Sequence, residues 1–363
     1  MAKEIKYTTS EQQIEQLKQK GLLFDNVQEA QNSLNRYGYY NIINSYKGTY
    51  QTLENGKRVY LENTTFEQIF SMFTLDHSLR NSIMASMLDL EECLRAAVAE
   101  IIARNFGIDH NVYLNYNNYR DRVSSNPKFS LKGVLSTLHN NVYSGKDPIR
   151  YYREQYGVIP PWILLKGTYF STLINFIKCF KHKQKQQLLS ILLSNFASQD
   201  ITPEIISLFQ TTLFICLDYR NAAAHGGRIY NFHSNYTDNL SITSNLITLF
   251  PQLKDVKNLS GIHQLMSLLD IFKYKQPLHI IADSLNEQVN RHLHRYPNDI
   301  NLLSQHIGVP IEKQLFVWVN EKTKKYHYIN TCSGLANAQQ LPLSAEIIAN
   351  YSPCKRCTTS FSL

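Results

Sequence analysis

The residues of this chain best suited to chemistry lie in the stretch YRNAAAHGGRIYN, at positions 219 to 231. Arg220, Asn221 and His225 stand around three alanines at the end of an apolar helical pattern, and two glycines follow. Asn221 and His225 are four residues apart and share one helix face, while the alanines keep the neighbouring surface thin. A partner helix or a nucleotide can approach closely there. One glycine suffices to stop a helix, so a stop alone does not account for this stretch.

These side chains supply the functions that cleavage of RNA by its own 2′-hydroxyl group requires. His225 falls in the last helical turn, where the helix dipole favours a positive charge, and it could exchange protons near neutral pH. Arg220 stays charged and offers a planar fork to phosphate oxygens. The reaction needs a base, an acid and a cation, but no metal. The alternative is structural, because an Arg and a His near a helix end are commonly a cap and a surface group.

A second set of reactive residues gathers near the C-terminus. The segment QLFVWVNEKTKKYHYI predicts two strands around a polar turn, and the helix-like LSAEIIANY leads into SPCKRC. Three cysteines and a histidine make a complete tetrahedral zinc set, which is closed and therefore structural rather than catalytic. The alternative is three free thiols in a tail. The predicted ligands of this structural Zn2+ are His327, Cys332, Cys354 and Cys357.

The other three cysteines, Cys93, Cys179 and Cys216, are scattered through apolar helical patterns and are predicted to be inert core residues in a reducing compartment. The first residues, MAKEIKYTTSEQQ, lack the apolar core of a signal peptide, and no apolar run approaches the ~18 residues of a membrane span. We therefore expect a cytoplasmic protein.

Composition favours a folded protein with an anionic partner. The 363 residues are 43% hydrophobic, which is ample for a packed core and excludes a disordered chain. Lys and Arg number 37 against 29 Asp and Glu, giving a net charge of +8 that favours nucleic acid as the first choice of partner. The predicted RNA-binding residues are Tyr39, Tyr40, Lys178, Lys181, Lys183, Lys185 and Arg228.

Each part of this RNA-binding set has a plainer alternative. The tyrosines, together with Tyr37, Tyr46 and Tyr50, could stack on unpaired bases, or they could pack at a core edge with wet hydroxyl groups. The lysines could follow a phosphate backbone, or they could be a solvated helix end.

The chain is predicted to be mainly α-helical. Asn55-Gly56 indicates a small N-terminal β-hairpin, and strands return from Gln314. Thr64 and Glu67 predict a capping box that opens a long apolar helix ending at Gly107. Within that helix, a break near residue 80 is one option.

We expect Thr202-Pro203 to open a central helix that runs to the RNAAAH stretch. The predicted divisions are an N-terminal helical and hairpin segment at 1–62, a helical domain at 63–296 and a small α+β zinc-binding module at 310–363.

The sequence resembles a known family in several segments taken in order. RNAAAH fits the Arg-x4-His motif of HEPN ribonucleases, and RNAAAHGGRIYN resembles the matching segment of the bacterial Abi (abortive infection, AbiD/AbiF-like) family. The resemblance covers most of the first 235 residues, including IEQLKQKGLLFDNVQEAQNSLNRYGYYNIINSYK, FEQIFSMFTLDHSLRNSIMASMLDLEECLRAAVAE and PPWILLKGTYFSTLINFI. Leu75-Asp76 stands where the family has Phe-Asp. The C-terminal module resembles Ada-like zinc modules, which are not part of the usual Abi core.

The resemblance implies a HEPN-type helical bundle that acts on RNA in antiphage defence or as a toxin. It also implies control by a partner noncoding RNA or by an antitoxin. Arg220 and His225 match the catalytic pair, and Asn221 matches the polar residue that orients them. HEPN sites are commonly built from two motifs, so the single motif of this chain implies a homodimer. The alternative function is a noncatalytic RNA-binding HEPN protein that holds a structured noncoding RNA without cutting it.

Four further charged residues fall on family positions. Asp76 and Arg80 are four residues apart, as are Glu91 and Arg95, and this spacing predicts ion pairs along a helix. Glu91 is also a candidate for a group that orients the arginine or the histidine of the motif.

Overall fold

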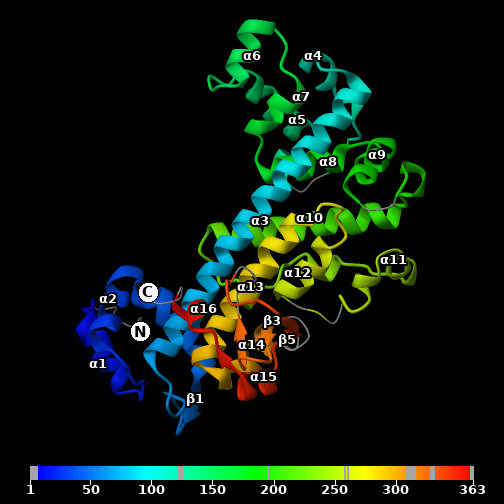
Figure 1. Cartoon of the computed structure of the whole chain (residues 1–363). Helices are drawn as coiled ribbons and strands as arrows, with labels where there is room; N and C mark the ends of the chain where they lie inside the picture. The colour runs from blue at the N-terminus through cyan, green and yellow to red at the C-terminus, as the bar shows by residue number, and fades with distance from the viewer. Residues whose placement is uncertain are drawn as a thin grey trace. The chain divides into compact units, whose positions relative to one another are not determined.

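The chain folds into two compact units that are mainly helical. The computed structural model describes residues 7–121, 126–193, 196–256, 259, 261–307, 316–327 and 332–359. Unit 1 contains residues 1–81, 228–231 and 283–363, and unit 2 contains residues 82–227 and 232–282. Figure 1 shows the helices that make up most of both units. The predicted mainly α fold with small sheets near both ends is confirmed.

This division rests on contacts within the fold, and the sequence-based ranges 1–62, 63–296 and 310–363 stay predictions. The HEPN type of the helical bundle also stays a prediction. Among the described residues, no helix is both long enough and apolar enough to cross a membrane.

Unit 1 begins with short helices and the predicted hairpin. Strands β1 and β2 pair antiparallel, with Gln51 opposite Tyr60. Asn55 and Gly56 both have positive φ, 49° and 75°, as the tight turn between the strands requires. The elements in chain order are α1 (Ser10–Lys18), α2 (Val27–Tyr37), the π-helix η1 (Tyr40–Asn44), β1 (Gln51–Glu54), β2 (Lys57–Tyr60) and the start of α3 (Phe66–Phe106).

The start of α3 differs from the predicted capping box. Thr65, not Thr64, accepts a hydrogen bond from the N–H group of Gln68, at 3.1 Å. Glu67 does not reach back to its own helix start. Its carboxylate accepts the N–H groups of Asp25 and Asn26, each at 3.1 Å, just before α2 begins. Sequence spacing could not reveal this, because the carboxylate serves the start of a different helix.

A buried carboxylate on α3 anchors the chain segment that follows the glycine pair. Asp76 is fully buried and accepts the N–H groups of Ile229 and Tyr230, at 2.8 and 2.7 Å, and the hydroxyl of Tyr46, at 2.6 Å. We expected Asp76 to pair with Arg80 along the helix. Its oxygens accept these three hydrogen bonds, and the positive charge of Arg80 opposes the rise in the pKa of Asp76 that burial causes. The pairing itself stays a prediction. No break occurs in α3 near residue 80.

Unit 2 is a bundle of helices around α10, which is buried along much of its length. It packs against α8, α9 and α12 (Figure 1). The hydroxyl of Thr202 accepts the N–H of Ile205 at 3.4 Å and so caps α10, as predicted. Besides the rest of α3, the helices are α4 (His110–Tyr113), α5 (Leu131–Val142), α6 (Ile149–Tyr156), α7 (Pro161–Leu164), α8 (Phe170–Cys179), α9 (His182–Leu192), α10 (Pro203–Ala224), α11 (Ser244–Leu249), α12 (Gly261–Leu269) and the start of α13 (Gln276–Arg295).

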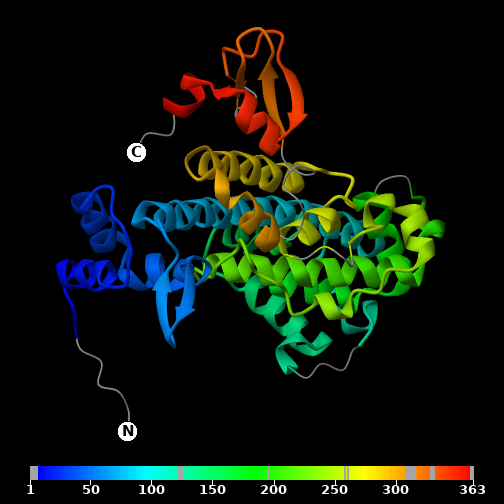
Figure 2. The ribbon, with the colours of Figure 1, turned by 90° about the horizontal axis from the view of Figure 1, so that it is seen from below.

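The C-terminal part of unit 1 is a small sheet with short helices. The strand order is β5-β3-β4-β6, antiparallel except for the β4-β6 pair. Figure 2 shows these strands and the two last helices in orange and red. The elements are α14 (Ile300–Ile307), β3 (Phe316–Asn320), β4 (Lys325–His327), β5 (Gln339–Pro342), α15 (Ala345–Asn350), β6 (Ser352–Pro353) and α16 (Lys355–Thr359).

The Asp76 contacts predict a large loss of stability when the carboxylate is removed. Asp76→Ala leaves two buried N–H groups and one hydroxyl without an acceptor, and each such group costs about 1 to 3 kcal/mol. We expect the free energy of unfolding to fall by about 3 kcal/mol or more, and by about 1 kcal/mol in Tyr46→Phe, which removes one of the three hydrogen bonds. Urea denaturation followed by circular dichroism measures both changes.

Glu62→Ala is the matched control, because it removes the same charge from an exposed position of unit 1. A loss in Asp76→Ala no larger than that of the control would contradict the anchoring role.

Candidate functional site

The helix that carries the RNAAAH stretch ends in a way that requires both glycines. Gly226 has φ of 73° and donates its N–H to the Ala223 carbonyl at 3.3 Å, while Gly227 donates to the Ala222 carbonyl at 2.8 Å. This pair of hydrogen bonds is a Schellman termination, in which the first residue beyond the cap must adopt positive φ. A Cβ on Gly227 would lie 2.9 Å from the Ala222 oxygen. The second glycine therefore allows the close approach that the helix end needs.

The three candidate catalytic residues occupy the last turn of α10 in unit 2. His225 is the C-cap residue and its side chain is exposed, whereas Arg220 and Asn221 are half-buried. The backbone N–H of His225 donates to the Asn221 carbonyl at 3.0 Å. The Arg220 guanidinium lies 3.5 Å from the Asn221 side-chain oxygen, which is a long contact for a hydrogen bond. The cap thus uses the backbone of His225 and leaves its imidazole open to a substrate.

A buried carboxylate lies behind Arg220. Glu91, on α3, has 3% of its surface exposed and forms the predicted ion pair with Arg95 at 2.5 Å. Arg95 also donates to the Thr168 carbonyl at 3.0 Å. Burial raises the pKa of Glu91, and the positive charges of Arg95 and Arg220 oppose that rise. Glu91 is therefore close enough to Arg220 for the two charges to interact.

One N–H group of the Arg220 guanidinium has no acceptor among the described residues. Its Nε is buried and has no hydrogen-bond partner within the part of the chain that the structure describes. A buried donor without an acceptor is costly, so it is a place where a ligand oxygen would be stabilising.

Tyr219 and Asp218, which directly precede Arg220, form hydrogen bonds to residues 232–235 of unit 2. Tyr219 is buried and donates its hydroxyl to the Phe232 carbonyl at 2.9 Å. Asp218 accepts the Ser234 hydroxyl at 2.7 Å and the Asn235 N–H at 3.2 Å. Sequence reasoning missed these supports, although a polar residue inside an apolar helix was a signal for Asp218, as it was for Asp76.

The surface beside the motif is thin, as its alanines predict. Ala222 is half-buried and Ala224 is exposed. Neither presents more than a methyl group, so a second helix could lie close to this turn of α10.

The predicted tyrosine cluster divides into core and surface residues. Tyr46 and Tyr50 are buried, and their hydroxyls donate to Asp76 and to Asp299, the latter at 2.7 Å. Their hydroxyls are therefore neither wet nor free to meet RNA. Tyr39 is half-buried, and Tyr40 is 73% exposed. Tyr40 is the better placed of these two to stack on a base.

The predicted lysines lie at the end of α8 and at the start of α9. Lys178 lies 4.6 Å from the ring centre of Phe214, and Lys181 donates to the Asn117 carbonyl at 2.6 Å. Lys183 is exposed and Lys185 is half-buried. Lys178 and Lys181 therefore have structural contacts. Arg228, in unit 1, is exposed and donates to the Ser45 carbonyl at 2.9 Å.

The four predicted metal ligands come together in unit 1. His327 ends β4, Cys332 follows it, and Cys354 and Cys357 flank the start of α16. Their ligand atoms all lie within 4.8 Å of one another, so they could hold one metal ion. His327 Nδ1 lies 3.3 Å from the sulfur of Cys332 and 3.7 Å from that of Cys357. Cys332 and Cys354 have their sulfurs 4.0 Å apart.

The surroundings of this cluster favour the protonation states that bind metal. Burial lowers the pKa of His327 and the charge of Lys325 adds to this, which favours the neutral ring. Burial raises the pKa of Cys354, but hydrogen bonds from Cys357 and Arg356 outweigh it and lower the pKa overall. A Cβ on Gly334 would lie 2.8 Å from the His327 ring, so the loop passes close against the imidazole.

Comparison with known proteins supports one assignment. No curated protein and no protein of known structure matches the chain significantly. The sequence profile of the Abi-like protein family matches residues 32–231, which is more than half of the chain and includes α3 and the whole RNAAAHGGRIYN stretch. The chain therefore belongs to the Abi-like protein family, and this membership suggests a role in abortive infection.

Proposed function

We propose that this protein is an antiphage endoribonuclease of abortive infection that cuts RNA without a metal ion. The observation that carries the proposal is the exposed imidazole of His225 at the same helix end as Arg220, whose charge interacts with the buried Glu91. The end of α10 thus presents a proton-transfer group open to solvent and a charged arginine five residues before it. Family membership is consistent with this role.

The reaction follows from these groups. His225 removes the proton from a 2′-hydroxyl, and the resulting oxygen attacks the adjacent phosphorus to form a 2′,3′-cyclic phosphate. The bond from phosphorus to the 5′ oxygen breaks, and that oxygen takes a proton from an acid. Arg220 stabilises the charge that develops on the phosphate oxygens. Asn221 orients the arginine and the histidine.

The acid in this scheme comes from a second copy of the motif. One chain supplies one RNAAAH stretch, so a homodimer about a twofold axis gives two histidines and two arginines to one cleft. The methyl-lined surface at Ala222 and Ala224 permits that approach. In the cell, a noncoding RNA or an antitoxin would hold the nuclease in check.

We further propose that the His327 cluster holds one structural zinc ion. In a tetrahedral site with Zn–S distances of about 2.3 Å, ligand atoms lie about 3.5 to 3.8 Å apart. The contacts of 3.3, 3.7 and 4.0 Å within the cluster fit that spacing. Four protein ligands leave no open position, so the ion would join β4 to the start of α16 and would not take part in cleavage.

The first test of the nuclease is the substitution His225→Ala. We expect the purified protein to cleave single-stranded RNA in EDTA and the variant to be slower by about 10²- to 10⁴-fold, because proton transfer is lost. Gel analysis of a labelled RNA measures the rate, and end-group analysis identifies the cyclic phosphate. RNA binding should survive, since the helix cap uses only the backbone of His225.

His139→Ala is the matched control, because it removes an exposed histidine on α5. If His225→Ala cuts at the parent rate, His225 is not the proton-transfer group. If the parent protein binds RNA but does not cut it, the chain is an RNA-holding protein and not a nuclease.

A second test concerns Glu91, which we expect to position Arg220. Glu91→Gln keeps the shape of the side chain and removes the charge that interacts with Arg220, so the cleavage rate should fall by about tenfold. Loss of positioning lowers kcat, whereas loss of RNA affinity raises KM, and steady-state kinetics separate the two.

Glu100→Gln is a close control, because Glu100 forms an ion pair with Arg104 at the same spacing and the same 2.5 Å on the same helix, but in an exposed position. Equal effects of the two substitutions would show that Glu91 acts through helix stability alone.

The zinc proposal predicts one zinc ion per chain by elemental analysis of the purified protein. Cys354→Ser/Cys357→Ser should lose that zinc, because two of the four ligands are replaced by poor ones. Cys93→Ser, which changes a thiol of unit 2, should keep it. Equal zinc content in all three proteins would rule the site out.

A further inference from the structure

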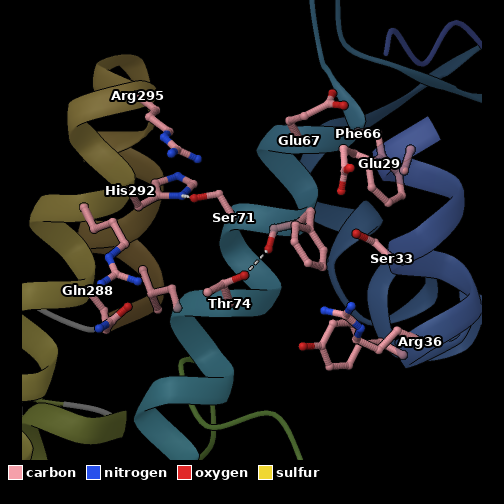
Figure 3. Close-up of a pocket in the computed structure, with 15 residues that line it drawn as sticks. Glu29, Ser33, Arg36, Phe66, Glu67, Ser71, Thr74, Gln288, His292 and Arg295 are labelled. Atoms are coloured by element: carbon pink, nitrogen blue, oxygen red, sulfur yellow. Dashed lines mark hydrogen bonds between the residues drawn. The ribbon is translucent and has the colours of Figure 1, made fainter. Parts of the chain in front are cut away.

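A cavity of ≈ 310 Å³ opens within unit 1 between α2, α3 and α13. Figure 3 shows its walls: Arg36, Ser33 and Glu29 on α2, Ser71 and Thr74 on α3, and Gln288, His292 and Arg295 on α13. All the lining residues belong to unit 1. The nuclease motif is not among them. The volume lies at the lower end of the range for pockets that bind small molecules.

Three arginines line the cavity, against two carboxylates. Arg36 and Arg295 extend into it from opposite walls, and within the described residues neither makes an ion pair (Figure 3). Arg291 pairs with Glu287 at 3.3 Å. Burial lowers the pKa of Arg291, and the charge of Arg295 adds to that lowering. An anion between these side chains would relieve the repulsion.

The two acidic residues of the lining have other roles. Glu67 accepts the N–H groups of Asp25 and Asn26 at the start of α2. Glu29 lies in the first turn of α2, where the helix dipole stabilises a negative charge. These carboxylates serve the helix end and leave the arginines for a ligand.

Aromatic residues of α2 and α3 also line the cavity. The rings of Phe66 and Phe70 are stacked with centres 6.0 Å apart and planes 12° from parallel, and Tyr37 lies 6.1 Å from Phe70. Phe70 and Tyr37 are half-buried, and both line the cavity. A flat ring of a ligand can pack against such a wall.

A buried acceptor in the lining lacks a donor. Gln288 has 7% of its surface exposed, and its side-chain oxygen has no hydrogen-bond partner among the described residues. A buried acceptor without a donor is costly, so the position favours a ligand that brings an N–H group.

Ser71 is held at the cavity by a chain of hydrogen bonds. Its hydroxyl lies 2.9 Å from Nδ1 of His292, and Nε2 of His292 lies 2.9 Å from the carboxylate of Asp299. Asp299 also accepts the hydroxyl of Tyr50 and the amide of Gln68. These residue types are those of a hydrolytic triad, but Ser71 lies inside continuous helix, where backbone N–H groups are used within the helix and cannot form an oxyanion hole.

We propose that this cavity binds a nucleoside phosphate, with the phosphate between Arg36 and Arg295, the base against Phe70 and Tyr37, and a base N–H group on the oxygen of Gln288. Ser71 adds a hydroxyl to the phosphate site. The ligand is either a free nucleotide or the 5′-phosphorylated end of an RNA, since both present the same group.

Calorimetric titration of the full chain with adenosine 5′-monophosphate tests the site. We expect saturable binding, weaker binding of adenosine and of inorganic phosphate, and a dissociation constant raised about tenfold in Arg295→Ala and in Arg36→Ala. Arg58→Ala, which removes an exposed arginine of unit 1 outside the cavity, should bind like the parent. The absence of saturable nucleotide binding, or an equal loss in Arg58→Ala, would overturn the proposal.

Gln288→Leu separates a ligand-binding role from a structural one. It removes the unpartnered oxygen and keeps the volume, so the melting temperature of the free protein should not fall while nucleotide affinity drops. A large drop in melting temperature together with unchanged affinity would contradict the assigned role of Gln288.

Short RNAs with a 5′-phosphate or a 5′-hydroxyl identify the source of the ligand, with His225→Ala protein used so that no RNA is cut. Competition with the nucleotide by the phosphorylated RNA alone supports an RNA end, and competition by neither RNA supports a free nucleotide. Equal competition by both RNAs would count against phosphate recognition in the cavity. Nucleotide binding does not depend on cleavage, so failure of this proposal leaves the nuclease proposal standing, and the reverse holds too.

Discussion

A buried carboxylate with several donors is the interaction on which most of the functional region depends. Asp76 accepts hydrogen bonds from two N–H groups and a tyrosine hydroxyl. It thereby fixes residues 229 and 230, which lie shortly after the glycine pair. Asp299 does the same for the wall of the unit 1 cavity, and Glu91 holds Arg95. Burying a charge is costly unless it is fully hydrogen-bonded. Each of these acids therefore defines one arrangement of its neighbours and disfavours others.

The two proposed sites of the protein use charge in opposite ways. At the end of α10, the buried Glu91 is close enough to Arg220 for the two charges to interact, so the protein itself supplies the opposite charge. In the cavity of unit 1, Arg36 and Arg295 form no ion pair with the described residues, so the ligand itself would supply the opposite charge. The first arrangement suits catalysis, which needs preorganised groups, and the second suits binding, which gains from neutralising them.

Local features of the fold were predictable from sequence, but contacts between distant segments were not. Asn55-Gly56, Thr202-Pro203 and the glycines after RNAAAH act on their own neighbours, and the structure confirms the turn, the helix start and the helix end. The four metal-binding residues also meet as predicted, because cysteine and histidine spacing carries information across a loop. The predicted capping residue of α3 was wrong by one position, because Thr64 and Thr65 are adjacent and have the same side chain. The partners of Glu67, Asp76 and Ser71 lie far away in the chain, and periodicity carries no signal for them.

At the helix end formed by residues 225–227, one side chain is free to change and another position must remain glycine. The protein uses the main chain of His225 to close the helix, whereas its side chain touches solvent. Gly227 has no such freedom, because any side chain there would collide with the carbonyl of Ala222. If the proposed nuclease activity holds, a single substitution of His225 would abolish cutting and leave the helix end intact. The geometry would then give a one-step evolutionary path from a nuclease to a protein that only binds its former substrate.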